Sequence, residues 1–155
     1  MLVGVAPADP LPALAGLPCH LPEATYELAA EGVLADTALA TLGWALGAYQ
    51  FTRYRAAKRA PARLIVAAGE LARLAPLVEA TSRVRDLVNT PTQDMGPEQL
   101  GEAIETLAKA HKAKLRDWVG DELLKANFPT IHAVGRASHR APRLVELSWG
   151  KPDHP

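Results

Sequence analysis

Histidine and carboxylate side chains are the groups that bind catalytic metals, and in this sequence they are scattered. His132, His139 and His154 do not share helical spacing with one another or with an acidic partner. No H-E-x-x-H pattern occurs, whereas a hydrolytic metal site needs several ligands within about 2–2.5 Å of the ion. The spacing therefore predicts no metal-binding residue, and these histidines are interpreted as surface or core side chains.

The two candidate nucleophiles also lack the context that nucleophilic catalysis needs. Ser138 stands directly before His139, but neighbouring residues rarely form a nucleophile–base pair, and no G-x-S-x-G elbow is present. Cys19 is the single cysteine, so it cannot form an internal disulfide, and it is interpreted as an inert thiol. The sequence predicts no catalytic residue, and the lone thiol favours a reducing, cytoplasmic setting.

Two turns could hold polar ligands. Asp86 and Asp94 flank the Asn89-Thr90-Pro91 turn, where such side chains usually cap backbone groups. Gly135 and Arg136 could bind an anion through a backbone N–H and a guanidinium. We favour capping for the first pair and a simple turn with a solvent-facing arginine for the second.

Composition and charge limit the partners. The chain is 48% hydrophobic and 22% charged, and its 17 Lys and Arg balance its 17 Asp and Glu. These values are typical of a soluble globular protein and predict no nucleic-acid partner. The N-terminus, MLVGVAPADP, lacks the basic and apolar regions of a secretory signal, so no export is expected.

A basic cluster in the first half of the chain allows two interpretations. It comprises Arg53, Arg55, Lys58, Arg59 and Arg63, with Tyr54 inside it. Such a cluster could contact phosphate or an acidic surface. We favour a solvated helix end, where cations also suit the helix dipole.

Hydrophobic spacing predicts the elements of the first half. Residues 2–6 form a short strand and residues 62–67 another, with a mostly apolar, buried helix between them over about residues 35–55. That helix is too short in its uncharged part for the roughly 20 residues of a membrane span. Gly43 and Gly47, four apart, indicate close approach of a neighbouring backbone.

The second half predicts strands alternating with helices. A connection at Ala68 and Gly69 precedes a helix with Pro76 in its first turn, which stops before Pro91. Gly96-Pro97-Glu98 starts an amphipathic helix to His111. Strands follow at residues 115–119 and 143–149, with a short helix capped by Asp121 between them, so an α/β fold is expected.

Three longer strings carry a specific resemblance. They are VRDLVNTPTQDMGPEQL at residues 84–100, NFPTIHAVGRASHRAPRLVELSWG at residues 127–150, and LGWALGAYQFTRYR from Leu42 to Arg55. Together they resemble the leucyl aminopeptidase family, the di-metal cytosol aminopeptidases, over its N-terminal portion only. The residues that match the family motifs are expected to be structural: Arg85, Asp86, Asn89, Pro91, Asp94, Gly96, Pro97, Gly135 and Ser138.

The resemblance implies a fold, an activity and an assembly. Residues 1–68 would be a partial N-terminal α/β domain of macro-like fold, and residues 69–155 the first helices and strand of an α/β catalytic domain. The parent would be a cytoplasmic, hexameric exopeptidase that releases N-terminal residues from peptides. It would use two divalent ions, manganese or zinc, bound by a lysine and several Asp or Glu residues. Those ligands follow the present segment in the family, so this chain alone is expected to bind no metal and to be inactive.

Two alternatives remain open. The chain could be a non-catalytic binding or interaction module of macro-like fold, although it lacks a glycine-rich phosphate loop after a strand. It could also be a fragment with no independent role. If the chain is the N-terminal portion of the parent, the strand at 143–149 would leave an apolar face and an unpaired edge, so we expect a marginally stable, oligomeric or aggregation-prone chain.

Overall fold

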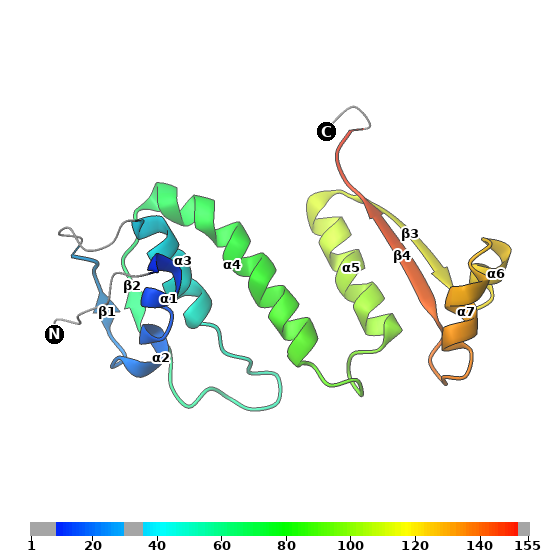
Figure 1. Cartoon of the computed structure of the whole chain (residues 1–155), viewed down its shortest axis with the longest axis horizontal. Coiled ribbons are helices and arrows are strands. Elements are labelled where there is room, and N and C mark those ends of the chain that lie inside the picture. Colours follow the sequence, from blue (N-terminus) through cyan, green and yellow to red (C-terminus); the bar gives the residue numbers. More distant parts are fainter. Residues whose placement is uncertain (1–8, 30–35, 152–155) are drawn as a thin grey trace. The chain divides into compact units, whose positions relative to one another are not determined.

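The computed structural model describes residues 9–29 and 36–151, which belong to two compact units, residues 1–89 and residues 90–155 (Figure 1). Each unit contains both helices and strands, as the predicted α/β class requires. The strand expected over residues 2–6 and the side chain of His154 lie outside the described residues.

The first unit opens with two short helices that begin at proline-containing turns. Helix α1 spans Pro10–Ala13 and α2 spans Leu17–His20, and the Asp9 carboxylate caps α1 by accepting a hydrogen bond from the Leu11 N–H. Strand β1, Thr25–Tyr26, pairs in parallel with β2, Arg63–Leu64. The strand predicted at 62–67 is therefore only two residues long, because its partner offers no more.

Helix α3, Thr37–Gly47, contributes Ala40 and Trp44 to the core of this unit. Asp36 caps its start by accepting from the Leu39 N–H at 3.0 Å. Its Trp44 is buried and donates from Nε1 to the Ala62 carbonyl, 3.2 Å away. The surrounding core contains Leu14, Leu21, Ala40 and Ala62.

The predicted extension of this helix to Arg55 is wrong. The final carbonyls of α3 accept side-chain donors instead of continuing the ladder: Arg85 donates to Leu46 O and Cys19 donates to Gly47 O. These contacts satisfy carbonyl groups that every helix end leaves without an intrahelical partner. Residues 48–62 consequently form a long irregular loop.

Gly43 and Gly47 confirm the predicted close approach of a neighbouring backbone. A Cβ added at Gly43 would fall on the carbonyl of Leu11, and one added at Gly47 on the carbonyl of Ala15. Helix α1 and the turn after it thus pack directly on the α3 backbone.

Helix α4, Ala68–Asn89, begins earlier than expected. The connection predicted at Ala68 and Gly69 is its first turn, and Pro76 lies inside it rather than in its first turn. A proline there removes a hydrogen bond to the carbonyl four residues earlier, that of Ala72. Ala72 and Pro76 are both exposed, so water can reach that carbonyl. The helix ends at Asn89, as the following Pro91 predicted.

The second unit is a two-stranded antiparallel sheet with helices on both faces. Strands β3, Lys114–Val119, and β4, Arg143–Ser148, pair antiparallel from Lys114 opposite Ser148 to Val119 opposite Arg143. Both match the predicted strands closely. Helix α5, Pro97–His111, contacts both strands, while α6, Glu122–Lys125, lies against β3 and α7, Pro129–Gly135, against β4.

Local details of this unit refine the predictions. Pro97 is the first residue of α5 as expected, and Gly101 and Ala108 are buried, whereas Leu100 is 44% exposed. Asp121 precedes α6 but makes no capping hydrogen bond, because its carboxylate contacts His132 Nε2 at 3.2 Å. The short helix ends at Lys125, ahead of Asn127, whose φ of 62° lies outside the helical region.

None of the helices in the part of the chain that the structure describes is both long enough and apolar enough to span a membrane.

Candidate functional site

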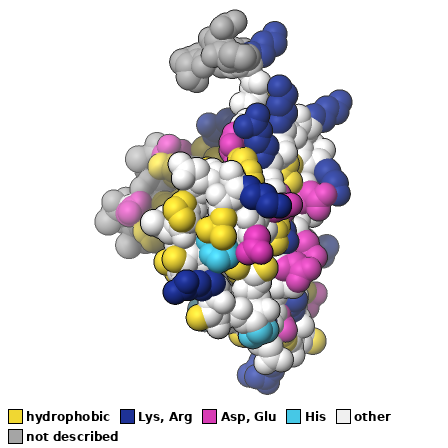
Figure 2. Space-filling model, turned by 90° about the vertical axis from the view of Figure 1, so that its right-hand side faces the viewer, with side chains coloured by type: hydrophobic (Ala, Val, Ile, Leu, Met, Phe, Trp, Pro, Cys, Tyr) yellow, Lys and Arg dark blue, Asp and Glu magenta, His cyan; other side chains and the backbone are white. Residues whose placement is uncertain are grey.

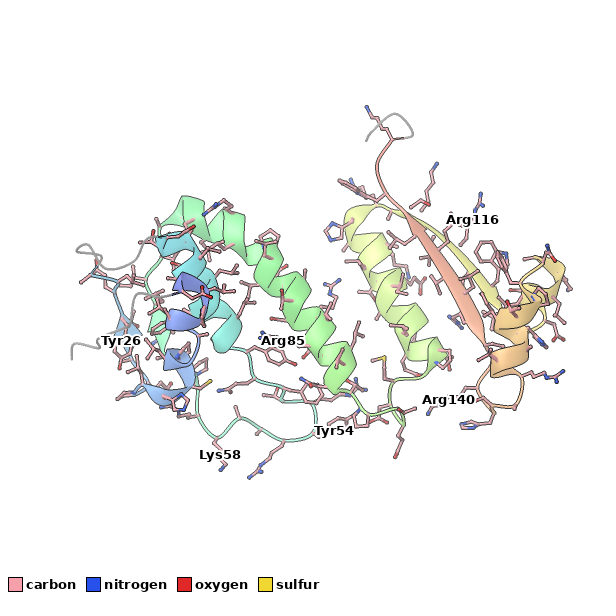
Figure 3. The ribbon with its side chains drawn as sticks, in the orientation of Figure 1. Tyr26, Tyr54, Lys58, Arg85, Arg116 and Arg140 are labelled. Atoms are coloured by element: carbon pink, nitrogen blue, oxygen red, sulfur yellow. The ribbon has the colours of Figure 1, made fainter. Side chains whose placement is uncertain are left out.

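The family-motif residues of α4 converge on one tyrosine. The Tyr49 hydroxyl donates to Asp86 Oδ1 at 2.7 Å and accepts from Asn89 Nδ2 at 3.2 Å. The Arg85 guanidinium lies 5.3 Å from the centre of the Tyr49 ring and donates to Leu46 O at 2.6 Å (Figure 3). We call these four residues, Tyr49, Arg85, Asp86 and Asn89, the Tyr49 cluster.

The Tyr49 cluster fixes the last turns of α4 against the segment that follows α3. Loss of hydration, and then the hydrogen bond that the hydroxyl donates to the Asp86 carboxylate, raise the pKa of the Tyr49 hydroxyl above its usual value. The tyrosine therefore stays protonated and donates to Asp86 throughout the physiological range. Asp86, interpreted from sequence as a capping residue, thus makes a side-chain contact far along the chain.

The remaining motif residues gather around an arginine in the second unit. The Arg140 guanidinium donates to the carbonyls of Thr92 and Gln93, at 2.5 and 2.6 Å, and its side chain fills the space where a Cβ at Gly96 would lie. A turn from the Pro91 carbonyl to the Asp94 N–H, at 2.9 Å, shapes the same segment. We call this arrangement the Arg140 clamp.

Ser138 contacts the backbone of Arg140, and Gly135 lies against Pro142. Ser138 Oγ accepts from the Arg140 N–H at 3.1 Å, and Gly135 leaves room for the ring of Pro142. Arg136, considered from sequence as part of an anion site with Gly135, is exposed at the end of α7. The two motif strings are therefore brought together in the second unit by packing and backbone hydrogen bonds.

The clamp borders an open hollow at the start of α5. Its volume is about 410 Å³, and its lining includes Glu98, His139, Arg140 and Arg143. The Arg143 guanidinium is engaged with Asp117 Oδ2 at 2.9 Å. The lining of the hollow thus contains both acidic and basic side chains, and the charge of Arg143 is neutralised by Asp117.

The other candidate side chains lie apart from one another. Within residues 9–29 and 36–151, no three His, Cys, Asp or Glu side chains are placed to hold a metal ion. These residues do not fit a two-metal centre. Cys19 donates to Gly47 O at 3.4 Å, and His132 contacts Asp121.

Sequence reasoning missed the two residues that organise the motif, Tyr49 and Arg140. Each lies inside a string that had been recognised, but neither carries a spacing signal. The available signal was indirect, because buried or helix-end polar groups such as Asp86 require partners.

Two family descriptions match successive parts of the chain. Residues 1–67 match the N-terminal domain of the M17 aminopeptidases, and residues 82–155 match the catalytic domain of the cytosol aminopeptidase family. A probable cytosol aminopeptidase of Leifsonia xyli is 38% identical over 118 residues, covering 69% of this chain and 24% of the relative. One from Streptomyces coelicolor is 31% identical over 145 residues, covering 76% of this chain and 28% of the relative.

Solved structures give the same result for the fold. The cytosol aminopeptidase of Coxiella burnetii has a TM-score of 0.86 at 33% identity, covering 96% of this chain and 33% of that one. The bottromycin maturation enzyme BotP, solved in complex with Mn, has a TM-score of 0.67 at 31% identity, covering 83% of this chain and 30% of that one. The chain thus spans about a quarter to a third of the length of these relatives.

Proposed function

Because this chain belongs to the leucyl, or cytosol, aminopeptidase family as a partial chain, we propose that it is the structural N-terminal portion of a metallo-exopeptidase. The parent would release N-terminal amino acids from peptides in the cytoplasm, as a homo-hexamer. The observation that carries this proposal is the pair of successive family matches, to the N-terminal domain and then to the catalytic domain.

Within that parent, this chain supplies positioning rather than chemistry. The boundary that we propose after residue 68 falls at the first residue of α4, and the division between the compact units falls at the last residue of the same helix. The Tyr49 cluster holds the end of α4, and the Arg140 clamp holds the segment leading into α5. The Tyr49 cluster would thus fix the chain within the first unit, and the Arg140 clamp would fix it within the second.

The metal chemistry would come from residues outside this chain. Two divalent ions, manganese or zinc, would lower the pKa of a bound water and polarise the peptide carbonyl. The described residues offer no ligand group for them. We therefore propose that the 155-residue chain has no peptidase activity by itself.

Hydrolysis of an N-terminal leucine anilide by the purified chain, with added manganese, tests this proposal against a mock purification. No turnover above the mock is expected. A matched positive control is the same chain fused to the remainder of a homologous cytosol aminopeptidase, which should hydrolyse the anilide in a chelator-sensitive way. Metal-dependent turnover by the 155-residue chain alone would contradict the scaffold role.

A further inference from the structure

Charge is strongly segregated within the first unit. The first 50 residues contain five Asp and Glu but no Lys or Arg, whereas residues 51–63 contain five Lys and Arg and no acid. A neutral chain can therefore carry a local positive surface, which its net charge conceals.

The helix-dipole explanation for this cluster does not hold. Helix α3 ends at Gly47, well before the first cation, Arg53, and residues 53–59 lie in the irregular loop. A dipole acts within the last helical turn, so it does not stabilise cations at these positions. The helix dipole therefore does not account for the positive charge of the loop.

One arginine of the cluster, Arg59, anchors the loop through hydrogen bonds. Arg59 donates from its guanidinium to Leu21 O at 2.6 Å, and its own carbonyl accepts from Gln50 Nε2 at 3.2 Å. The contact between Gln50 and Arg59 closes the segment between them. We call this segment, residues 51–58, the basic loop. Arg59 is thus structural and holds the basic loop in place.

The cations of the basic loop are available to a ligand. Arg53, Arg55 and Lys58 are exposed, and none of the three forms an ion pair with another described residue. Tyr54 lies among them with 53% of its surface exposed. The Phe51 ring lies 5.8 Å from the Tyr54 ring in an edge-to-face arrangement, and the Arg53 guanidinium lies 5.8 Å from the centre of the Tyr54 ring.

We propose that the basic loop binds single-stranded nucleic acid without sequence preference. Arg53, Arg55 and Lys58 would contact phosphates, and the ring of Tyr54 would stack on a base. Cations along a backbone path combined with an exposed aromatic ring are the pairing that such proteins use. An acidic protein surface would use the cations but would gain little from base-type stacking on the tyrosine. The absence of a nucleic-acid partner, expected from the neutral net charge, does not apply to this local surface.

Fluorescence anisotropy with a labelled oligothymidylate measures the binding directly. The test variant is the 155-residue chain with Arg53→Gln, Arg55→Gln and Lys58→Gln. The control variant, Arg73→Gln, Arg83→Gln and Lys112→Gln, removes the same charge from other exposed positions. We expect at least tenfold weaker binding for the test variant and a change below twofold for the control. Loss of three contacts should also flatten the slope of log affinity against log salt concentration by about 2.

The tyrosine gives an independent arm of the experiment. Tyr54→Leu should weaken binding about tenfold and Tyr54→Phe should retain it, because stacking needs the ring and not the hydroxyl. Circular dichroism confirms that each variant keeps the wild-type helix content.

The assignment would be overturned by no binding at low salt, by equal losses of affinity in the test and control variants, or by no effect of Tyr54→Leu. It would also be overturned if polyglutamate of the same charge displaced the labelled oligothymidylate as well as unlabelled oligothymidylate does. Equal affinity for duplex and single strand would likewise reject the single-strand assignment.

Discussion

The Tyr49 hydroxyl contacts side chains far along the chain, and its pKa depends on the contact with Asp86. Its pKa is raised first by loss of hydration and second by the hydrogen bond to Asp86. Asp86→Asn should therefore lower the pKa of Tyr49, because the negative charge beside the hydroxyl is removed. NMR titration of ring-labelled tyrosine measures this pKa, with Glu79→Gln on the same helix as the control.

The raised pKa of Tyr49 also predicts how the free energy of unfolding depends on pH. Since the folded-state pKa is raised, the contribution of Tyr49 to stability is fully present below about pH 10, the value of an unfolded tyrosine. It is lost as the pH rises through the folded-state value. An unchanged Tyr49 pKa in the Asp86→Asn variant would show that the hydrogen bond has no role in solution.

Arg140 makes the second prediction at the scale of the residue. Its guanidinium satisfies two backbone carbonyls, of Thr92 and Gln93. Arg140→Met keeps most of the side-chain volume but removes both donors, and should reduce the free energy of unfolding by about 2 kcal/mol. Urea unfolding of the wild type and the variant measures this difference in free energy. Arg136→Met changes an exposed arginine close by and should stay within about 0.5 kcal/mol of the wild type. Equal effects of the two substitutions would contradict the clamp.

At the scale of the element, the two glycines of α3 determine how closely α1 packs. A Cβ at Gly43 would overlap the carbonyl of Leu11, which belongs to the backbone and cannot rotate away. Gly43→Ala should therefore lower the free energy of unfolding by about 3 kcal/mol, at the upper end of overpacking effects.

Gly69 provides the matched control for that substitution. It lies in the first turn of α4, with no atom within 4 Å of an added Cβ. Gly69→Ala should raise the free energy of unfolding by about 0.5–1 kcal/mol, because alanine loses less backbone entropy in a helix. Thermal unfolding compares the two variants, and a stabilised Gly43→Ala protein would show that α1 does not pack on α3 in solution.

Elements with local signals could be predicted from the sequence, and elements that depend on distant partners could not. The start of α5 at Pro97 and the alternating strand from Arg143 carry their signals in adjacent residues. The end of α3 at Gly47 depends on Arg85 and Cys19, which no periodicity within the helix reveals. The position of Pro76 inside α4 depends on the exposure of the Ala72 carbonyl. For the motif, the residue types could be recognised, but the partners Tyr49 and Arg140 required three-dimensional structure.

At the scale of the whole molecule, a large amount of apolar surface is left uncovered. Exposed side chains include Leu124 at 48%, Val134 at 88% and Trp149 at 74%. Figure 2 shows apolar side chains lying among charged ones on one face of the protein. Among the described residues, β3 and β4 pair only with each other, so each has a free edge. Free edges and exposed apolar groups both favour association with other chains.

We therefore expect the 155-residue chain to self-associate through the end of its two-stranded sheet where β3 begins and β4 ends. An apolar hollow of about 330 Å³ lies there, lined by Leu107, His111, Ala113, Leu147 and Trp149. Trp149→Lys places a charge at this hollow and should shift the chain toward monomer in sedimentation velocity. Val134→Lys removes a more exposed apolar side chain from α7, away from the hollow, and should leave the distribution unchanged. A wild-type chain that sediments as a monomer and melts cooperatively would contradict this expectation. The two-stranded sheet and its helices would then be stable without further strands.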